Sequence, residues 1–309
     1  MKRINKVSVI GLGAIGAAYA SKLHDLNPNC VQVIADEERI RRYKSDGLWI
    51  NGRRCDFNYL TPEVEAGPAD LVLVAVKYQG LQQAIADIKH HVGPETVIMS
   101  LMNGISSEEI IAHTYGSENL LYAMCVAIDA GREGTDISFS SIGRICFGEK
   151  RNPSHSPKVR SVKQLFEQAG IPYEIPENME HAMWWKFMIN VGINQTSAVL
   201  KAPYRVFQEI REAHDLMVTA MQEVIELSKK AGVHLNEGDL AAFDLILRQS
   251  LSPEGKTSML QDIEAGRKTE VEYFAGTVCQ LGRRYGVPTP VNEMLFRMIR
   301  VLEQVNGRG

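Results

Sequence analysis

The sequence predicts two domains, an α/β domain with a parallel sheet followed by an all-helical domain. In the first half, short apolar runs alternate with helical segments, which is typical of a parallel sheet covered on both faces. The second half shows helical periodicity, and 309 residues are more than one hydrophobic core usually supports. We therefore expect one domain over residues 1–175 and a second over residues 176–309.

Buried strands are expected first along the chain. Short continuous apolar runs at Val7–Ile10, Val31–Ala35, Leu71–Val76 and Thr96–Leu101 predict them, with helices at 14–26 and 81–90 between. The pair Asn51-Gly52 stands between two extended stretches and indicates a hairpin. Antiparallel strands are expected within residues 137–147, and one more short strand within 171–178.

The second half has the periodicity of a helical bundle. Helices are expected at residues 177–200, 206–231, 238–249, 259–264, 270–285 and 292–304. Apolar side chains recur at steps of three and four through residues 206–231, which favours one long helix there.

Composition excludes several classes of protein. The chain has 34 Lys and Arg against 37 Asp and Glu, a net charge of −3, so we expect no nucleic-acid partner. It has no apolar run of about 18 residues, so no membrane span is expected. Five scattered cysteines suggest free thiols in the cytoplasm, and neither they nor the eight histidines have metal-ligand spacing. The basic, apolar N-terminus is compatible with a signal peptide, but the glycines within it favour a strand, loop and helix.

Those glycines form the first chemical motif. Gly11-Leu12-Gly13-Ala14-Ile15-Gly16 directly follows a strand and opens a helix. In this context the motif is a dinucleotide-binding loop, because glycines permit close backbone approach and the helix N-terminus attracts a pyrophosphate. The predicted fold is therefore an α/β Rossmann-like N-terminal domain followed by an all-α C-terminal domain, with a nicotinamide or flavin cofactor.

An acidic residue at the end of the second strand bears on the choice of cofactor. Asp36 stands twenty residues beyond Gly16, where a carboxylate usually binds the ribose 2′-hydroxyl and repels a 2′-phosphate. It therefore favours NAD(H). Two alternatives stay open: Asp36 is only a helix N-cap, or Arg39 or Arg41 reaches a phosphate.

A polar stripe opens the second domain. Lys186, Asn190 and Asn194 step by four residues along an otherwise apolar helix, so they share one face. Such a stripe indicates a polar ligand, and a lysine there suits a general acid. The alternative is a polar seam whose side chains bond backbone carbonyls.

Five ordered segments together resemble the ketopantoate reductase (2-dehydropantoate 2-reductase) family along nearly the whole chain. They are the glycine loop, Lys77 in Ala75-Val-Lys77-Tyr-Gln, Asn103-Gly104, the Trp185-Lys186 helix with Asn190 and Asn194, and Thr257–Asp262 followed by Arg267–Glu270.

The resemblance implies a reductase of a 2-keto acid, foremost 2-dehydropantoate to pantoate in pantothenate and coenzyme A biosynthesis, with the substrate between the domains. It implies that Lys186 is the general acid and that Glu270 supports it. The remaining roles it implies are substrate binding by Asn190, Asn194, Ser258 and Asn103, and a place at the cofactor edge for Lys77 and Asn103. It also suggests a homodimer.

Two positions depart from the family pattern. Asp36 stands where members that use NADPH usually carry an arginine, so the family implies NADP(H) while this residue favours NAD(H). Gly255 stands where known members carry a substrate-contacting asparagine. The substrate is therefore open between ketopantoate and another branched 2-keto acid, and a nucleotide sensor without turnover is the alternative from another class.

Overall fold

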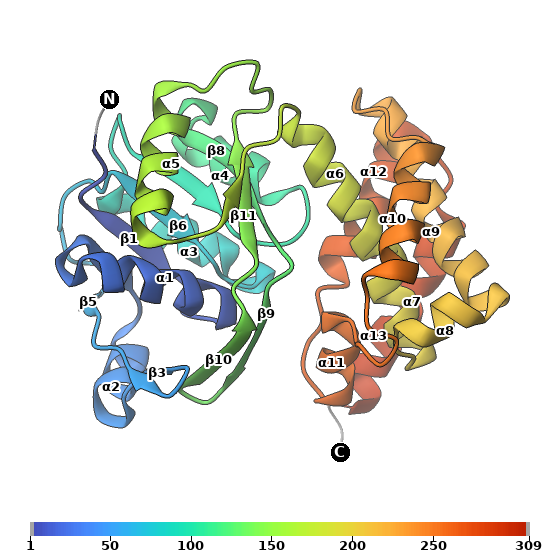
Figure 1. Cartoon of the computed structure of the whole chain (residues 1–309), viewed down its shortest axis with the longest axis horizontal. Helices are drawn as coiled ribbons and strands as arrows, with labels where there is room; N and C mark the ends of the chain where they lie inside the picture. The colour runs from blue at the N-terminus through green and yellow to red at the C-terminus, as the bar shows by residue number, and fades with distance from the viewer. Residues whose placement is uncertain (1–2, 307–309) are drawn as a thin grey trace. The chain divides into compact units, whose positions relative to one another are not determined.

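The computed structural model describes residues 3–306. The chain divides into two compact units (Figure 1). The first, here the N-terminal unit, comprises Met1–Asn103 and Ser107–Glu180; the second, the C-terminal unit, comprises Gly104–Ser106 and His181–Gly309. The main sheet lies in the N-terminal unit and the C-terminal unit is helical. The predicted fold class is thereby confirmed.

In the described chain, an eight-stranded sheet forms the centre of the N-terminal unit, with the order β5-β2-β1-β6-β7-β8-β11-β12. The strands from β5 to β8 in this order are parallel, whereas β11 runs antiparallel to β8. This is the doubly wound arrangement, in which the strand order reverses between β1 and β6. The bounds are β1 (Val7–Ile10), β2 (Val31–Ile34), β5 (Asn58–Leu60), β6 (Leu71–Val74), β7 (Val97–Ser100), β8 (Leu120–Val126), β11 (Arg144–Gly148) and β12 (Tyr173–Glu174).

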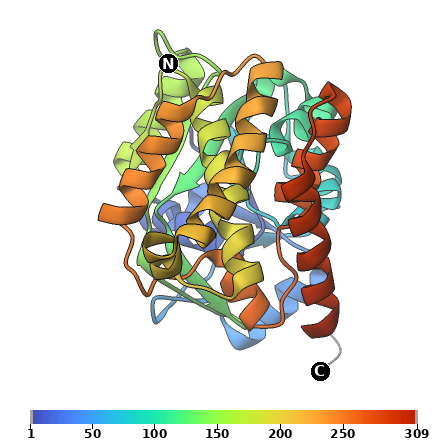
Figure 2. The same cartoon turned by 90° about the vertical axis from the view of Figure 1, so that its right-hand side faces the viewer.

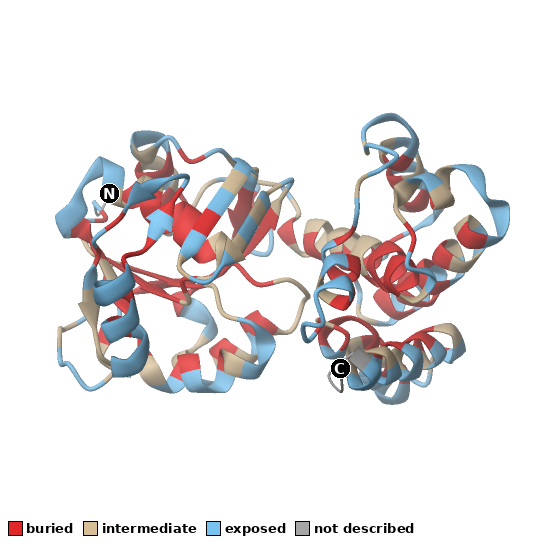
Figure 3. Cartoon of the chain, turned by 90° about the horizontal axis from the view of Figure 1, so that it is seen from below, coloured by how far each residue is buried: buried red, intermediate tan, exposed pale blue. Residues whose placement is uncertain are grey.

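The central strands are buried on both faces. Every residue of β1, β6 and β7 is buried, which explains why the sequence shows continuous apolar runs there rather than alternation. Val7 of β1 pairs with Val31 on one side and with Leu71 on the other. Figure 3 shows strands of this sheet largely in the buried colour, with exposed surfaces on helices around them.

Helices connect these strands. They are α1 (Ala14–Leu26), α2 (Glu37–Asp46), α3 (Leu81–Asp87), α4 (Ser107–Tyr115) and α5 (Pro157–Ala169), with short 3₁₀ turns at Pro28–Cys30, Tyr78–Gly80, Lys89–His91 and Ser117–Asn119. Helix α1 has the bounds that the sequence predicts and packs against α5. The charged run in α2 is a solvated helix face, since Ile40 and Tyr43 are its buried residues.

A smaller four-stranded sheet, in the order β4-β3-β10-β9, also belongs to the described N-terminal unit. Its strands are β3 (Trp49–Ile50), β4 (Arg53–Arg54), β9 (Asp129–Glu133) and β10 (Asp136–Ser141). The predicted hairpin is present: Asn51 and Gly52 both have positive φ, 48° and 74°, as its two-residue turn requires. Strand β10 pairs with β3 in parallel and with β9 in an antiparallel hairpin.

The C-terminal unit is a bundle of helices (Figure 2). The helices are α6 (Met179–Ile189), α7 (Gln195–Leu200), α8 (Tyr204–Glu209), α9 (Arg211–Lys230), α10 (Glu237–Gln249), α11 (Ser258–Glu264), α12 (Thr277–Tyr285) and α13 (Pro290–Asn306). Two five-residue π-helices interrupt this regular pattern in the described chain: η5 (Asn190–Asn194) joins α6 to α7, and η6 (Glu272–Gly276) precedes α12. A short π-helix of this kind often marks a functional site.

The prediction of a single helix over residues 206–231 is wrong, because the structure has two helices there. Ile210 has an extended backbone (φ −104°, ψ 112°) and separates α8 from α9. Hydrogen bonds to a distant segment hold the end of α8: Gln208 Nε2 donates to the carbonyl of Leu247 in α10 (2.8 Å) and to that of Leu251 just beyond α10 (3.1 Å). The apolar periodicity continues across the break, so it does not reveal where one helix ends.

None of the helices within residues 3–306 combines the length and the apolar character that crossing a membrane requires.

Candidate active site

The glycine loop is packed against the strand next to β1. Gly11 has φ +96°, and a Cβ there would lie 2.5 Å from the carbonyl oxygen of Ala75. A Cβ on Gly16 would lie 2.0 Å from the carbonyl oxygen of Gly11. Side chains at these two positions would therefore collide with backbone, and glycine is required for the loop to close.

The N-terminus of α1 has the features of a pyrophosphate site. Gly13 is the N-cap, and among the described residues no side chain bonds to the N–H groups of this first turn as a cap. A Cβ on Gly13 would come no closer than 4.0 Å to Ala75, so the loop is open on this side. Leu12 is buried and its carbonyl accepts a hydrogen bond from Arg132, while Ala14 and Ile15 are partly buried. The residues therefore fit a dinucleotide, whose phosphates need free N–H groups and close approach.

Asp36 lies beyond the end of β2 and caps α2. Its Oδ1 accepts a hydrogen bond from the backbone N–H of Arg39 (2.7 Å), and its Oδ2 lies 3.4 Å from Arg39 Nε. The side chain of Asp36 is 53% exposed. The helix-cap alternative is thus present in the structure, and ribose binding by the same carboxylate stays a prediction.

Lys77 and Asn103 follow β6 and β7, the next two parallel strands beside β1. Lys77 is exposed and precedes a 3₁₀ turn, where its carbonyl accepts from the N–H of Gly80 (2.8 Å). Asn103 is partly buried in the segment between β7 and α4. Because carboxyl ends of parallel strands share an edge of the sheet, the structure brings both residues to the edge where the glycine loop lies.

A buried hydrogen-bond chain lies beside the Asn103 segment. Ser100 Oγ, at the end of β7, donates to Ser107 Oγ (2.8 Å), which donates to Glu108 Oε2 (2.9 Å). Glu108 Oε1 is buried and has no hydrogen-bond partner in the described part of the chain. Burial raises the pKa of Glu108 to about 7. No sequence pattern pointed to this carboxyl group.

The polar stripe runs along a helix that is not regular. Lys186 lies in the last turn of α6, while Asn190 and Asn194 are the first and last residues of η5, where the sequence predicted a plain α-helix. Asn194 Nδ2 donates to Asn190 Oδ1 at 3.1 Å, so the two amides lie together. Asn194 is buried, and Lys186 and Asn190 are partly buried.

Ser258 lies on, and Glu270 lies just before, an element that contacts η5. Ser258 is the exposed first residue of α11, and its neighbour Thr257, not Ser258, caps that helix by accepting from the N–H of Leu260 (3.2 Å). Glu270 is partly buried just before η6, and its carbonyl accepts from the N–H of Tyr273 (2.9 Å). Since η5 contacts both α11 and η6, the structure groups the elements that carry Asn190, Asn194 and Ser258 with the helix that begins two residues after Glu270.

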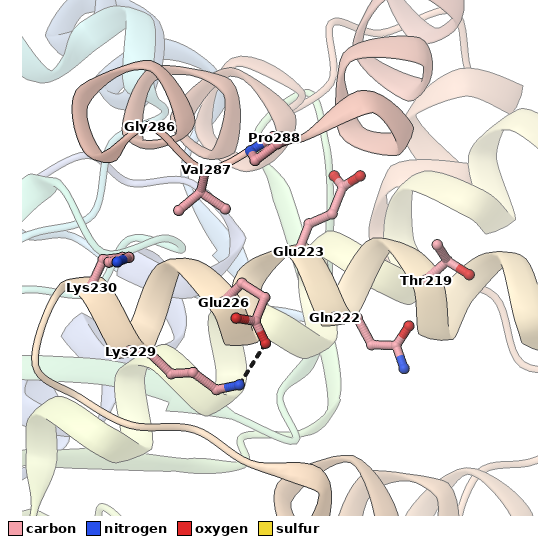
Figure 4. A pocket seen from close by; sticks show the side chains of 9 residues that line it. All are labelled: Thr219, Gln222, Glu223, Glu226, Lys229, Lys230, Gly286, Val287 and Pro288. Carbon is pink, nitrogen blue, oxygen red and sulfur yellow. Dashed lines mark hydrogen bonds and ion pairs between the residues drawn. The ribbon is translucent and has the colours of Figure 1, made fainter.

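A hollow elsewhere on the C-terminal unit is lined by residues of α9 and of the turn before α13 (Figure 4). Its volume is about 710 Å³. Lys229 at its rim bonds Glu226 at 2.5 Å, and the Glu223 carboxylate accepts from backbone N–H groups. None of the predicted site residues lines it, so we place the proposed chemistry elsewhere.

Family models match both halves of the chain. A family model described as "Ketopantoate reductase PanE/ApbA" matches residues 7–152, and one described as "Ketopantoate reductase PanE/ApbA C terminal" matches residues 178–303. The chain is 24% identical to a 2-dehydropantoate 2-reductase of Aquifex aeolicus over 310 residues, which covers 98% of each protein.

Two solved structures are similar over nearly the whole chain. One is D-mandelate dehydrogenase with NADH and anilino(oxo)acetate, with a TM-score of 0.85, 21% identity, and coverage of 97% of this chain and 99% of that one. The other is a dimeric ketopantoate reductase from Staphylococcus aureus, with a TM-score of 0.81, 20% identity, and coverage of 98% and 100%.

The doubly wound sheet, its glycine loop and the helical second unit make up a Rossmann-type fold, and the relatives show that the chain is an oxidoreductase. More particularly, the chain belongs to the ketopantoate reductase family, a family of NAD(P)H-dependent oxidoreductases.

Proposed function

We propose that the protein reduces a 2-keto acid to the 2-hydroxy acid, foremost 2-dehydropantoate to pantoate, and so serves pantothenate and coenzyme A biosynthesis. The observation that carries this proposal is the grouping in the C-terminal unit. Lys186 and the bonded pair Asn190 and Asn194 lie on one continuous helix, and η5 contacts α11, which begins at Ser258, and η6, which begins two residues after Glu270. A cation and several neutral donors suit an anionic, hydroxylated substrate.

The N-terminal unit would hold the cofactor. The N–H groups of Gly13, Ala14 and Ile15 would bind the pyrophosphate at the start of α1, and Asp36 would bind the ribose. Lys77 and Asn103 would border the nicotinamide end at the same sheet edge. When bound, NAD(P)H supplies the hydride that the carbonyl carbon receives.

The C-terminal unit would supply the proton. As the carbonyl oxygen gains negative charge, Lys186 Nζ stabilises it and then donates a proton to it, which completes the hydroxyl group. The Glu270 carboxylate keeps the lysine protonated and oriented. Asn190, Asn194 and Ser258 bind the hydroxyl and carboxylate groups of the substrate, and Asn103 contacts it from the cofactor side.

A second candidate substrate is another branched or an aryl 2-keto acid, and the surroundings of Gly255 favour it. A Cβ on Gly255 would lie 2.8 Å from Cδ2 of Tyr204, so an asparagine there would displace that ring. The Gly255 carbonyl also accepts from the backbone N–H of Tyr204 (3.0 Å). An aromatic ring in place of an amide suits an apolar substituent better than a hydroxyl group.

Steady-state assays of a panel of 2-keto acids, each with NADH and NADPH, test the substrate and cofactor together. We expect reduction of ketopantoate or of an apolar-branched analogue, with NADH preferred because the Asp36 carboxylate repels a 2′-phosphate. A strong preference for NADPH would contradict the role of Asp36 and direct attention to Arg39 and Arg41. Tight cofactor binding without any turnover would instead indicate a nucleotide sensor.

Lys186→Ala tests the mechanism. Loss of the proton donor should lower kcat on the best keto acid by roughly 10²- to 10⁴-fold. Lys230→Ala is the control, because Lys230 is an exposed lysine at the end of α9 in the same unit. Full turnover by the Lys186→Ala variant would show that Lys186 is not the general acid.

We further propose a cytoplasmic homodimer. All five cysteines are buried thiols, in keeping with a reducing compartment.

The dimer would form through helix α13. This helix exposes four apolar side chains that are between 42% and 62% accessible, Met294, Met298, Val301 and Val305. Their 4-3-4 spacing places them on one face, as in helices that pair with another helix, and a second copy of α13 is the partner that we propose.

A further inference from the structure

The two π-helices are joined by one buried side-chain amide. Gln195, directly after η5, has no exposed surface. Its Oε1 accepts from the backbone N–H of Ala275 in η6 (3.0 Å). Its Nε2 donates to the carbonyl of Val191 in η5 (2.7 Å) and to Asn292 Oδ1 (3.0 Å). Both nitrogen protons and the oxygen of this amide are therefore engaged.

The side-chain amide of Gln195 bonds a backbone N–H group that loses its usual helical partner in the π-helix η6. In an α-helix the N–H of Ala275 would bond the carbonyl of Val271, four residues earlier. In η6 the N–H of Gly276 takes that carbonyl at 3.0 Å. The N–H of Ala275 is thus left for Gln195 Oε1, and a buried N–H without a partner would be costly.

The other end of the amide is anchored to α9 and α13. Asn292, fully buried, donates from Nδ2 to the carbonyl of Ala220 (3.1 Å) and to Glu223 Oε2 (2.7 Å). The Glu223 carboxylate also accepts from the N–H groups of Val291 (2.8 Å) and Asn292 (3.0 Å). A buried network whose members are all bonded fixes one geometry.

We propose that Gln195 is a positioning residue that sets η5, with Asn190 and Asn194, against η6, which begins two residues after Glu270. The inference rests on the proposed function for its catalytic consequence. Gln195 touches the backbone of both π-helices, so its loss would shift the amides of η5 relative to the Glu270 segment. A displacement of about 1 Å in such a site can cost roughly 10²-fold in rate.

The substitution Gln195→Met keeps the length of the side chain but removes its three hydrogen bonds. We expect kcat/KM for the keto acid to fall roughly 10- to 100-fold, while the Kd of the cofactor, held by the N-terminal unit, stays unchanged. Gln208→Met is the matched control, because Gln208 also bridges two helices of the same unit through two hydrogen bonds. A loss in Gln195→Met no larger than in Gln208→Met would overturn the proposal.

Gln195→Glu provides a second variant with a pH signature. An ionised carboxylate still accepts from Ala275 but faces the oxygens of Val191 and Asn292, whereas a protonated one donates to one of them. Activity relative to the wild type should therefore recover as the pH falls from 8 to 5.5. A ratio that does not change with pH would contradict positioning by this amide.

Amide hydrogen exchange separates this inference from the proposed function. Exchange in residues 190–195 and 271–276 should accelerate in Gln195→Met and not in Gln208→Met, whether or not a substrate is known. If the wild type reduces no 2-keto acid, the proposed function fails, while faster exchange still supports the role of Gln195 in holding η5 against η6. Unchanged exchange in Gln195→Met would refute the positioning role of Gln195 itself.

Discussion

Gly13 and Gly16 lie in the same loop, but the structure places different demands on them. A Cβ on Gly16 would lie 2.0 Å from the Gly11 carbonyl oxygen, whereas one on Gly13 would have 4.0 Å to Ala75. Gly13 also has a negative φ of −69° that any residue adopts. Gly16 is therefore needed for folding of the loop, whereas on the proposed function Gly13 leaves room for the ligand.

Alanine at each position separates these roles. Gly16→Ala should lower the urea midpoint of unfolding, because the loop must open to admit the methyl group. Gly13→Ala should unfold at the wild-type midpoint yet bind dinucleotide at least tenfold more weakly by titration calorimetry, because the methyl group lies where phosphate approaches. Equal midpoints for the two variants would contradict this division.

Two buried titratable residues make the N-terminal unit respond to pH in opposite ways. Burial, with Lys6 and His90, lowers the pKa of His91 to about 4 from 6.5, so the stability it contributes is lost as pH falls from 6.5 toward 4. Burial raises the pKa of Glu108 to about 7 from 4.5, so its contribution is present below pH 4.5 and is lost as pH rises through 7.

Glu108→Gln tests the second effect. The amide resembles the protonated carboxyl and does not ionise, so the variant should gain stability over the wild type as pH rises from 5 to 8. The gain should reach at most on the order of 3 kcal/mol. Urea unfolding at several pH values measures it, and a difference that stays constant with pH would show that Glu108 does not titrate in this range.

At the scale of elements, local pattern predicted most of the N-terminal unit. Helix α1 has the predicted bounds, and β6 is two residues shorter than the predicted Leu71–Val76. Burial on both faces and the glycine loop act locally, so the sequence displays them. The helix predicted over 206–231 failed at Ile210, because the bonds of Gln208 that turn α8 reach residues 39 and 43 positions away.

The sequence indicates the residues of the candidate site, whose roles stay predictions, but not the geometry in which the structure holds them. Motif spacing and the family resemblance pointed to Lys186, Asn190 and Asn194, yet a period of 3.6 residues does not disclose a π-turn. Gln195 is bonded to Ala275 and Asn292, 80 and 97 residues away. No pattern in its own segment signals those partners.

At the scale of the molecule, the apolar face of α13 predicts self-association. Val301 lies at the centre of that face and is 58% exposed. The substitution Val301→Glu places a charge there and should raise the dimer dissociation constant at least tenfold in sedimentation equilibrium. Leu245→Glu is the control, because Leu245 is similarly exposed (56%) on another helix, α10. A monomeric wild type, or equal dimerisation by both variants, would contradict pairing through α13.

The pairing of β3 with β10 has a consequence for synthesis on the ribosome. Asn51 bonds Phe139, 88 residues later, so the hairpin of β3 and β4 leaves the ribosome well before its partner strand. At roughly 5–20 residues per second, the wait is about 4–18 s. During that time the edge of β3 that later pairs with β10 has no partner strand, while Arg53 and Arg54 on β4 place positive charge on the opposite edge of the hairpin. Positive charge on a strand edge discourages pairing between nascent chains there.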